Sequence, residues 1–218
     1  MKKLFLYVSL IIISILHAQQ KPNFWNEIQE FKKQNLQSPP PENAILLLGS
    51  SSFTMWKDVG NYFPDKTIIN RGFGGSRLVD LNYYSEELLN PYHPKQIIIY
   101  CGENDIAYDK EKTTAKTTFK RFKKLYKTIR SKYPKIEVDY ISMKRSPSRE
   151  QFWPEMKKAN AKIERFMTRK SNAEYIDIVT PMEDHNGNVR KDLFLDDMLH
   201  MKPSGYEIWA KTMKPYMK

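Results

Sequence analysis

The stretch Ala44-Ile45-Leu46-Leu47-Leu48-Gly49-Ser50-Ser51-Ser52 decides the fold of this chain. A short continuous apolar run followed by Gly and Ser predicts a strand that is buried on both faces and ends in a tight turn. Similar runs follow along the chain at Thr67–Asn70, Gln96–Cys101, Ile136–Met143 and Ala173–Val179. The sequence therefore predicts five strands.

Segments with helical periodicity separate these strands. We expect helices at Phe24–Gln34, Ser76–Leu89, Thr113–Tyr133, Pro154–Thr168 and Ser204–Tyr216. Strands that alternate with helices are joined by right-handed crossovers, so the sheet is parallel and helices cover both of its faces. The fold class predicted from this order is α/β: a three-layer α/β/α sandwich with a five-stranded parallel sheet.

The N-terminus has a different composition from the rest of the 218 residues. Lys2 and Lys3 precede an apolar run, Leu4–Leu16, that is too short to span a bilayer, and the small residue Ala18 follows it. We expect a signal peptide over residues 1–18 and a single domain over residues 19–218, exported and without a stable membrane anchor once the signal is removed. The alternative is an uncleaved anchor, because Leu16 is bulkier than a cleavage site prefers.

Composition limits the remaining possibilities. The only cysteine, Cys101, excludes an intramolecular disulfide framework and a Cys-rich metal site. A formal net charge of +11 suits either attraction to an anionic polymer or membrane surface, or a solvated basic surface that aids solubility. No recognised nucleic-acid-binding module is present, so we expect no nucleic-acid partner.

Residues that could act as a nucleophile or as hydrogen-bond donors follow the first three strands. These segments are Gly49–Phe53, Asn70–Ser76 and Cys101–Asp105. In a doubly wound sheet, ligands bind beyond the carboxyl ends of the strands. A serine at the first turn can expose its hydroxyl at a helix N-terminus, while the Gly-rich second turn and the Asn104 amide can donate hydrogen bonds to one oxygen atom. The three turns predict an acyl-transfer site with an oxyanion hole.

A serine nucleophile needs a general base. Of the four histidines, His17 lies in the expected signal peptide, His93 precedes a strand, and His185 lies in a polar turn. His200 remains, just ahead of the last predicted helix. Asp197 stands three residues before it and can hold the imidazole in the required tautomer.

These residues resemble four sequence blocks of the SGNH/GDSL hydrolase family, whose fold is flavodoxin-like. Gly49-Ser50-Ser51 resembles the first block. The other three blocks are matched by Asn70–Gly75, Gly102–Asp105 and Asp197–His200. The resemblance implies that Ser51 is the nucleophile, with Asp197 and His200 as its catalytic partners, and that Ser51, Gly75 and Asn104 form the oxyanion hole. The departure is Ser50, where Asp is usual, and the three consecutive serines leave Ser52 open as an alternative nucleophile.

The resemblance implies hydrolysis of carboxylic esters without a metal or organic cofactor. Short connections after the strands predict an open cleft that suits a short acyl group, such as acetyl, on a carbohydrate or similar polar small-molecule or polysaccharide substrate. We expect Asp105 and Trp153 to contact that substrate, although Trp153 also suits a structural turn. The alternatives are a lysophospholipase or thioesterase, and a non-catalytic glycan-binding module on the same fold.

Overall fold

The computed structural model describes residues 21–108 and 113–218. The expected signal peptide, residues 1–18, lies outside the described residues. Within the described part of the chain, no helix combines the length and the apolar character needed to cross a membrane.

The centre of the molecule is a five-stranded sheet in which every neighbouring pair of strands is parallel. Its strands are β1 (Ile45–Gly49), β2 (Ile68–Gly72), β3 (Gln96–Tyr100), β4 (Glu137–Ile141) and β5 (Tyr175–Ile176), in the spatial order β2-β1-β3-β4-β5. The predicted α/β fold with a five-stranded parallel sheet is confirmed.

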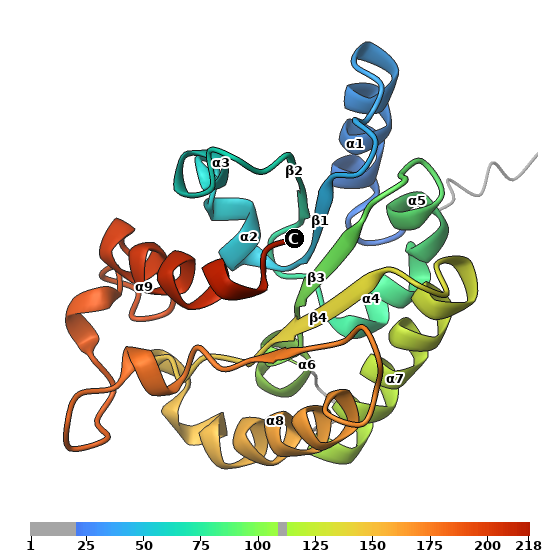
Figure 1. Ribbon diagram of the computed structural model, residues 1–218. Coiled ribbons are helices and arrows are strands. Elements are labelled where there is room, and N and C mark those ends of the chain that lie inside the picture. Colours follow the sequence, from blue (N-terminus) through green and yellow to red (C-terminus); the bar gives the residue numbers. More distant parts are fainter. Residues whose placement is uncertain (1–20, 109–112) are drawn as a thin grey trace, which may run out of the picture.

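Helices cover both faces of the sheet (Figure 1). The α-helices are α1 (Trp25–Gln37), α2 (Ser51–Met55), α3 (Val59–Tyr62), α4 (Leu78–Tyr83), α5 (Ser85–Leu89), α6 (Glu103–Ala107), α7 (Ala115–Lys132), α8 (Trp153–Met167) and α9 (Pro203–Met213). Four 3-10 turns, η1 (Pro147–Phe152), η2 (Thr180–Met182), η3 (Lys191–Leu193) and η4 (Lys214–Tyr216), lie in the second half of the chain.

The continuous apolar strands divide their side chains between two cores. Leu46 and Leu48 of β1 pack in the core formed with α1, α4, α5, α7 and α8, while Ile45 and Leu47 pack in the core formed with α2, α3 and α9. Successive residues of a strand point to opposite faces, so an unbroken apolar run is what a strand covered on both sides requires.

Two predicted elements differ from the structure. The fifth strand is only two residues long, because side chains take over its backbone hydrogen bonds: Ser142 Oγ accepts from the N–H of Ile178, and Asp177 Oδ1 accepts from that of Val179. The predicted helix Ser76–Leu89 is divided into α4 and α5 at Tyr84, whose backbone leaves the helical conformation. The short helices α2, α3 and α6 have too few residues for a periodic pattern to predict them.

The order of the strands creates a crevice. The connection from β1 to β2 runs through α2 and α3 on one face, whereas the connection from β3 to β4 runs through α7 on the other. The chain therefore leaves the carboxyl ends of β1 and β3 in opposite directions. Doubly wound sheets bind ligands in the crevice that opens at such a point.

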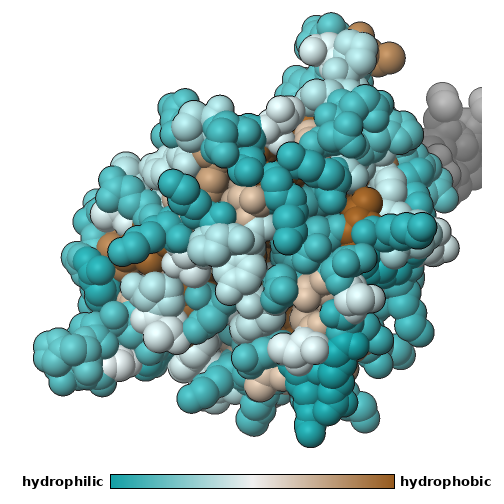
Figure 2. Space-filling model, viewed as in Figure 1, coloured by the Kyte–Doolittle hydropathy of each residue, from teal (hydrophilic) through white to brown (hydrophobic). Residues whose placement is uncertain are grey.

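The face drawn in Figure 2 is mostly hydrophilic, with only scattered hydrophobic residues.

Candidate active site

The turn after β1 is held in place by two close backbone approaches. A Cβ atom added to Gly49 would lie 2.2 Å from the carbonyl oxygen of Tyr100, and one added to Gly72 would lie 2.6 Å from Cβ of Phe53. The two glycines thus let β3 and α2 pack directly against the ends of β1 and β2. Ser50 has an extended backbone, and Ser51 is the first residue of α2.

Ser51, His200 and Asp197 form one hydrogen-bonded chain. Nε2 of His200 lies 3.0 Å from Oγ of Ser51, and Nδ1 of His200 lies 2.5 Å from Oδ2 of Asp197. This is the geometry in which an imidazole can take the proton of a serine hydroxyl while a carboxylate fixes its tautomer. The structure brings together the three residues that the sequence indicated for this role.

Asp197 is further bound by the backbone. Its Oδ1 accepts hydrogen bonds of 2.9 Å from the N–H groups of both Leu199 and His200. Burial alone would raise the pKa of Asp197, but these bonds and the contact with His200 lower it to about 2. The carboxylate is therefore ionised at any pH at which the folded protein is expected to work.

The loop that carries Asp197 and His200 is closed on itself. The N–H of Leu195 donates to the carbonyl of His200 at 2.8 Å, and Phe194 and Met201 form an isolated antiparallel bridge. Met198, at the tip, has a positive φ of 52°. Both the N–H and the hydroxyl of Ser148 donate to the carbonyl of Met198 at 3.0 Å, which ties the loop to the segment after β4.

Ser52 faces away from the histidine. Its side chain is 2% exposed, and its Oγ accepts a 3.4 Å contact from Nζ of Lys144 in the interior. Ser51 is half-buried and is the serine whose hydroxyl reaches His200. The local α-helical geometry of α2 explains the difference, because consecutive helical side chains point in different directions.

The Gly-rich turn after β2 lies beside Ser51. A Cβ atom added to Gly74 would lie 4.0 Å from Cβ of Ser51, and Gly75 has a positive φ of 82°. Among the described residues, the backbone N–H groups of Ser51 and Gly75 have no hydrogen-bond acceptor. Unpaired N–H groups next to a serine hydroxyl are suited to an oxyanion.

Asn104 approaches the same turn from α6. Its side chain is 4% exposed, and its Nδ2 donates to Oγ of Ser50 at 2.8 Å and to the carbonyl of Ser76 at 3.0 Å. The amide nitrogen of Asn104 thus lies against the residue that precedes Ser51. Together with Ser51, it lines a small pocket formed by Ser50, Ser51, Ser52, Tyr100, Cys101, Gly102, Glu103 and Asn104.

The two residues expected to contact substrate lie elsewhere. Asp105 is 0% exposed, and its carboxylate accepts from the N–H of Leu78 at 2.7 Å and from Arg121 at 2.8 Å. It anchors α4 and α7 to α6 and has no surface to offer a substrate. Trp153 is half-buried at the start of α8 and lines a surface pocket with Arg145, beyond the carboxyl end of β4, rather than the pocket that contains Ser51.

Sequence reasoning missed a buried charged cluster directly behind Asn104. Glu103 is 6% exposed, and Nζ of Lys144 and Nη1 of Arg149 lie 3.1 and 3.0 Å from its Oε2. Tyr100 donates its hydroxyl to the same carboxylate. Burial alone would raise the pKa of Glu103, but the charges of Lys144 and Arg149 hold it below its usual range. Glu103 lies within one of the four sequence blocks, but nothing in the sequence indicated its partners.

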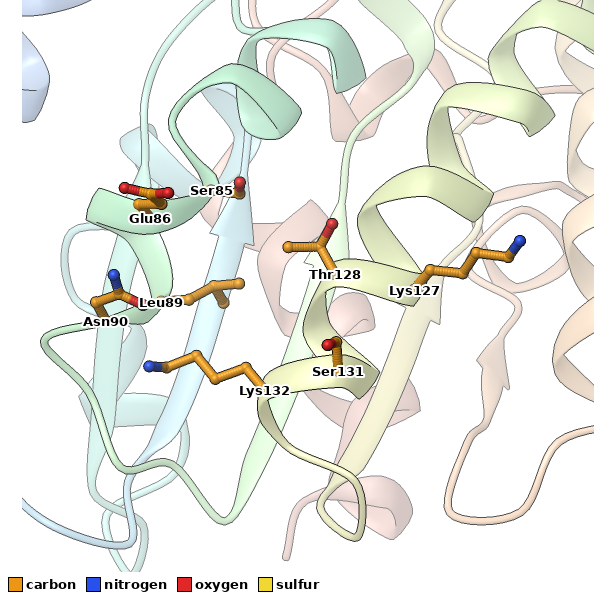
Figure 3. Close-up of a pocket in the computed structure, with 8 residues that line it drawn as sticks. All are labelled: Ser85, Glu86, Leu89, Asn90, Lys127, Thr128, Ser131 and Lys132. Atoms are coloured by element: carbon orange, nitrogen blue, oxygen red, sulfur yellow. The ribbon is translucent and has the colours of Figure 1, made fainter.

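The described residues contain no cluster that could hold a metal ion, and they contain a second, larger pocket on the surface. Within residues 21–108 and 113–218, no group of three or more His, Cys, Asp or Glu residues could hold a metal ion. A larger surface pocket lies between α5 and α7 (Figure 3), lined by Ser85, Glu86, Leu89, Asn90, Lys127, Thr128, Ser131 and Lys132. The four residues from α7 lie in its C-terminal part, which leads into the amino end of β4, and no residue of this pocket belongs to the pocket that contains Ser51.

Solved structures share this architecture. A GDSL-like lipase from Bacteroides thetaiotaomicron matches with a TM-score of 0.75 at 18% identity, over 87% of this chain and 96% of that one. A protein provisionally assigned as an acylhydrolase from Bacteroides fragilis matches with a TM-score of 0.77 at 17% identity, over 91% and 98%. An acetyl-xylooligosaccharide esterase from Geobacillus matches with a TM-score of 0.63 at 14% identity, over 82% and 96%.

At these identities the structural likeness shows the fold. A comparison with curated protein sequences gave no significant match. A family model is more specific: the model described as the GDSL-like lipase/acylhydrolase family matches residues 48–208, which include Ser51, Gly75, Asn104, Asp197 and His200. The chain belongs to the GDSL-like lipase/acylhydrolase family and is a carboxylic ester hydrolase.

Proposed function

We propose that the protein removes short acyl groups, above all acetyl, from a carbohydrate or similarly polar substrate, with Ser51 as nucleophile, His200 as general base and Asp197 as the carboxylate that orients it. The observation that carries this proposal is the continuous hydrogen-bonded chain from Oγ of Ser51 through the imidazole to Oδ2 of Asp197.

In the proposed mechanism, Oγ of Ser51 attacks the ester carbonyl carbon while Nε2 of His200 takes the hydroxyl proton. The carbonyl oxygen becomes negatively charged and receives hydrogen bonds from the N–H groups of Ser51 and Gly75 and from Nδ2 of Asn104. His200 then returns the proton to the leaving alcohol, and an acyl-enzyme remains. A water molecule, deprotonated by His200, attacks the acyl carbon and releases the acid.

Asn104 must change partners during this reaction. Its Nδ2 is bound to Oγ of Ser50 and to the carbonyl of Ser76. When the oxyanion forms, the bond to Ser50 is the one that can be exchanged, since a charged acceptor makes a stronger hydrogen bond than a hydroxyl.

Two observations support a short acyl group on a polar substrate. The pocket beside Ser51 is small, and most of its lining residues are polar: three serines, Glu103 and Asn104 line it with Tyr100, Cys101 and Gly102. The structural neighbours include proteins named as an acetyl esterase and an acetyl-xylooligosaccharide esterase. A lysophospholipase or thioesterase would need a longer apolar groove to receive its acyl chain.

The proposal is tested with purified protein on p-nitrophenyl acetate, butyrate and octanoate, on acetylated xylan, and on a lysophospholipid. We expect the acetyl ester to have the highest kcat/KM and acetate to be released from the polysaccharide. A fluorophosphonate probe should modify Ser51, mapped by mass spectrometry, and Ser51→Ala should abolish both turnover and labelling. Preferential cleavage of the octanoyl ester or lysophospholipid would replace the acetylesterase assignment, and labelling of Ser52 would overturn the choice of nucleophile.

We also propose that the enzyme acts after export, on the basis of the Lys2–Ala18 segment. Expression of the full chain should yield an exported protein whose N-terminal residue is Gln19. Recovery of intact, uncleaved protein in the membrane fraction would favour the anchored alternative instead.

A further inference from the structure

The side-chain amide of Asn104 has a defined orientation. Nη2 of Arg149 donates to Oδ1 of Asn104 at 2.7 Å, while Nδ2 of Asn104 donates to Ser50 and Ser76. A guanidinium group has only donors and no acceptor. Rotating the amide by half a turn would therefore place the amide N–H groups against the N–H groups of Arg149, and would remove the amide donor from the Ser76 carbonyl.

Arg149 is itself fixed on several sides. It is 6% exposed, its Nη1 donates to Oε2 of Glu103 at 3.0 Å, and its guanidinium carbon lies 4.7 Å from the ring centroid of Tyr108. Its backbone N–H donates to the carbonyl of Ser146 at 2.9 Å. The guanidinium thus has little freedom to leave Asn104.

Glu103 does not need Arg149 to remain paired. Nζ of Lys144 lies 3.1 Å from Oε2 of Glu103, and the backbone N–H of Lys144 donates to Oε1 at 3.0 Å. Two buried cations therefore surround a single carboxylate. Of the two, only Arg149 has a described contact with Asn104, so its second donor group serves the amide rather than the charge of Glu103.

We propose that Arg149 is a positioning residue for ester hydrolysis: it holds the Asn104 amide with Nδ2 directed at the nucleophile turn, ready to donate to the oxyanion. This inference rests on the proposed function of the Ser51 site. Preorganised donors stabilise an oxyanion because they need no large reorientation when the charge forms. With Oδ1 held by Arg149, Nδ2 has only to exchange the Ser50 hydroxyl for the oxyanion, and the amide does not have to rotate. Arg149 acts through Asn104 and does not itself contact the substrate.

The central test is Arg149→Met, which removes the donors but keeps an apolar side chain, measured on p-nitrophenyl acetate. Loss of one oxyanion donor costs about 10²–10³ in kcat, and a donor that is present but badly oriented should cost less, so we expect kcat to fall by about 10–100-fold. KM should change by no more than about twofold, because the interaction strengthens only in the transition state.

A double-mutant cycle separates positioning from mere structural support. In an Asn104→Ala background, Arg149→Met should lower kcat no further, because the group on which Arg149 acts is already gone. If the two losses multiply, Arg149 does not act through Asn104 and the proposal is wrong. The proposal is equally wrong if Arg149→Met alone retains kcat within about twofold of the wild-type value.

A matched control is Arg130→Met. Arg130 is half-buried and donates to the carbonyls of Ile136 and Asn172, ahead of β4 and β5 at the opposite edge of the sheet. This variant should lose stability without losing kcat. If Arg149→Met fails to fold, Arg149→Lys keeps a charge beside Glu103 but loses the planar pair of donors, and it should show the same selective loss of kcat.

Failure of this inference can be told from failure of the proposed function. If wild-type protein cleaves esters and Ser51→Ala does not, a normal kcat in Arg149→Met removes only the role of Arg149. If Ser51→Ala is as active as wild type, the site itself is wrongly assigned, and the role of Arg149 falls with it.

Discussion

Nε2 of His200 lies 3.0 Å from Oγ of Ser51, although 149 positions of the chain separate the two residues. The contact forms because Ser51 begins the helix after β1, while His200 closes the loop ahead of α9, which packs on the same face of the sheet as α2. This hydrogen-bonded pair is therefore a product of the whole fold, and the proposed roles of its partners can be tested one at a time.

Asp197→Asn should lower kcat by about 10²–10⁴ while leaving the loop folded. Asparagine can still accept the two backbone hydrogen bonds through Oδ1, but its amide nitrogen would face Nδ1 of His200 and favour the wrong tautomer. The measurement is kcat for p-nitrophenyl acetate beside the circular dichroism spectrum. A variant within about threefold of wild-type kcat would show that the carboxylate is dispensable.

Glu103→Gln should destabilise the protein by about 3–5 kcal/mol, because it leaves Lys144 and Arg149 buried without an anion. Lys144→Met should cost clearly less, since Glu103 then keeps Arg149 as a one-to-one partner. Urea denaturation of both variants at one pH gives the comparison. The reverse order of stability would mean that the charge of Glu103 is not the centre of the cluster.

We predict that the protonation of buried Asp139 makes the folded protein less stable as the pH rises. Its side chain is 0% exposed, and burial raises its pKa to about 7 against the opposing hydrogen bond from Gln96. Because the folded protein binds this proton more tightly than the unfolded chain does, the stabilisation is complete only below the pKa of an unfolded aspartate, about 3.9, and is lost progressively as the pH rises from there to about 7. Between about pH 5 and about pH 8 the free energy of unfolding should fall by about 2–3 kcal/mol from this group.

The control for this prediction is Asp139→Asn, which cannot ionise. Other groups also titrate in this range, so the quantity to compare is the difference between the two slopes of stability against pH, measured by urea denaturation. Parallel slopes for the variant and the wild type would exclude Asp139 as the source.

Gly72→Ala should reduce both stability and activity. The added methyl group would lie 2.6 Å from Cβ of Phe53 and 2.7 Å from the backbone nitrogen of Thr54, so α2, which carries Ser51, must shift. Overpacking of this kind costs about 1–3 kcal/mol. Gly60→Ala is the counterpart: nothing lies within 4 Å of its added Cβ, and we expect no loss of kcat and a gain of about 0.5 kcal/mol. Thermal melting and esterase assays distinguish the two.

The fold was predictable because its signals are local. Runs such as Ile45–Leu48 and Ile97–Ile99 are buried on both faces, and the periodicity of α7 and α8 follows their packed faces. The ends of elements were less predictable, because they depend on single side chains. Asp177 and Ser142, which bind the backbone after Ile176, shorten the last strand in a way that no run of apolar residues reveals.

The candidate site was predictable only in part. Ser51, Asn104 and His200 are polar residues placed directly after strands or ahead of a helix, so topology alone brings them to one edge. Lys144 and Arg149 carry charges that usually face water, and nothing local indicates that Glu103 draws both into the interior. The burial of Asp105 escaped prediction for the same reason, since its partner Arg121 comes from a different helix.

The closed loop that carries Asp197 and His200 has a consequence for motion. The carboxylate is bound to the backbone of the residue whose ring it orients, and the loop ends are joined between Leu195 and His200. His200 and Asp197 therefore move together if the loop swings to admit a substrate or release a product. Such a movement would break the contact with Ser51 while the imidazole keeps its tautomer, so each closure would return the proposed base already set to accept the proton.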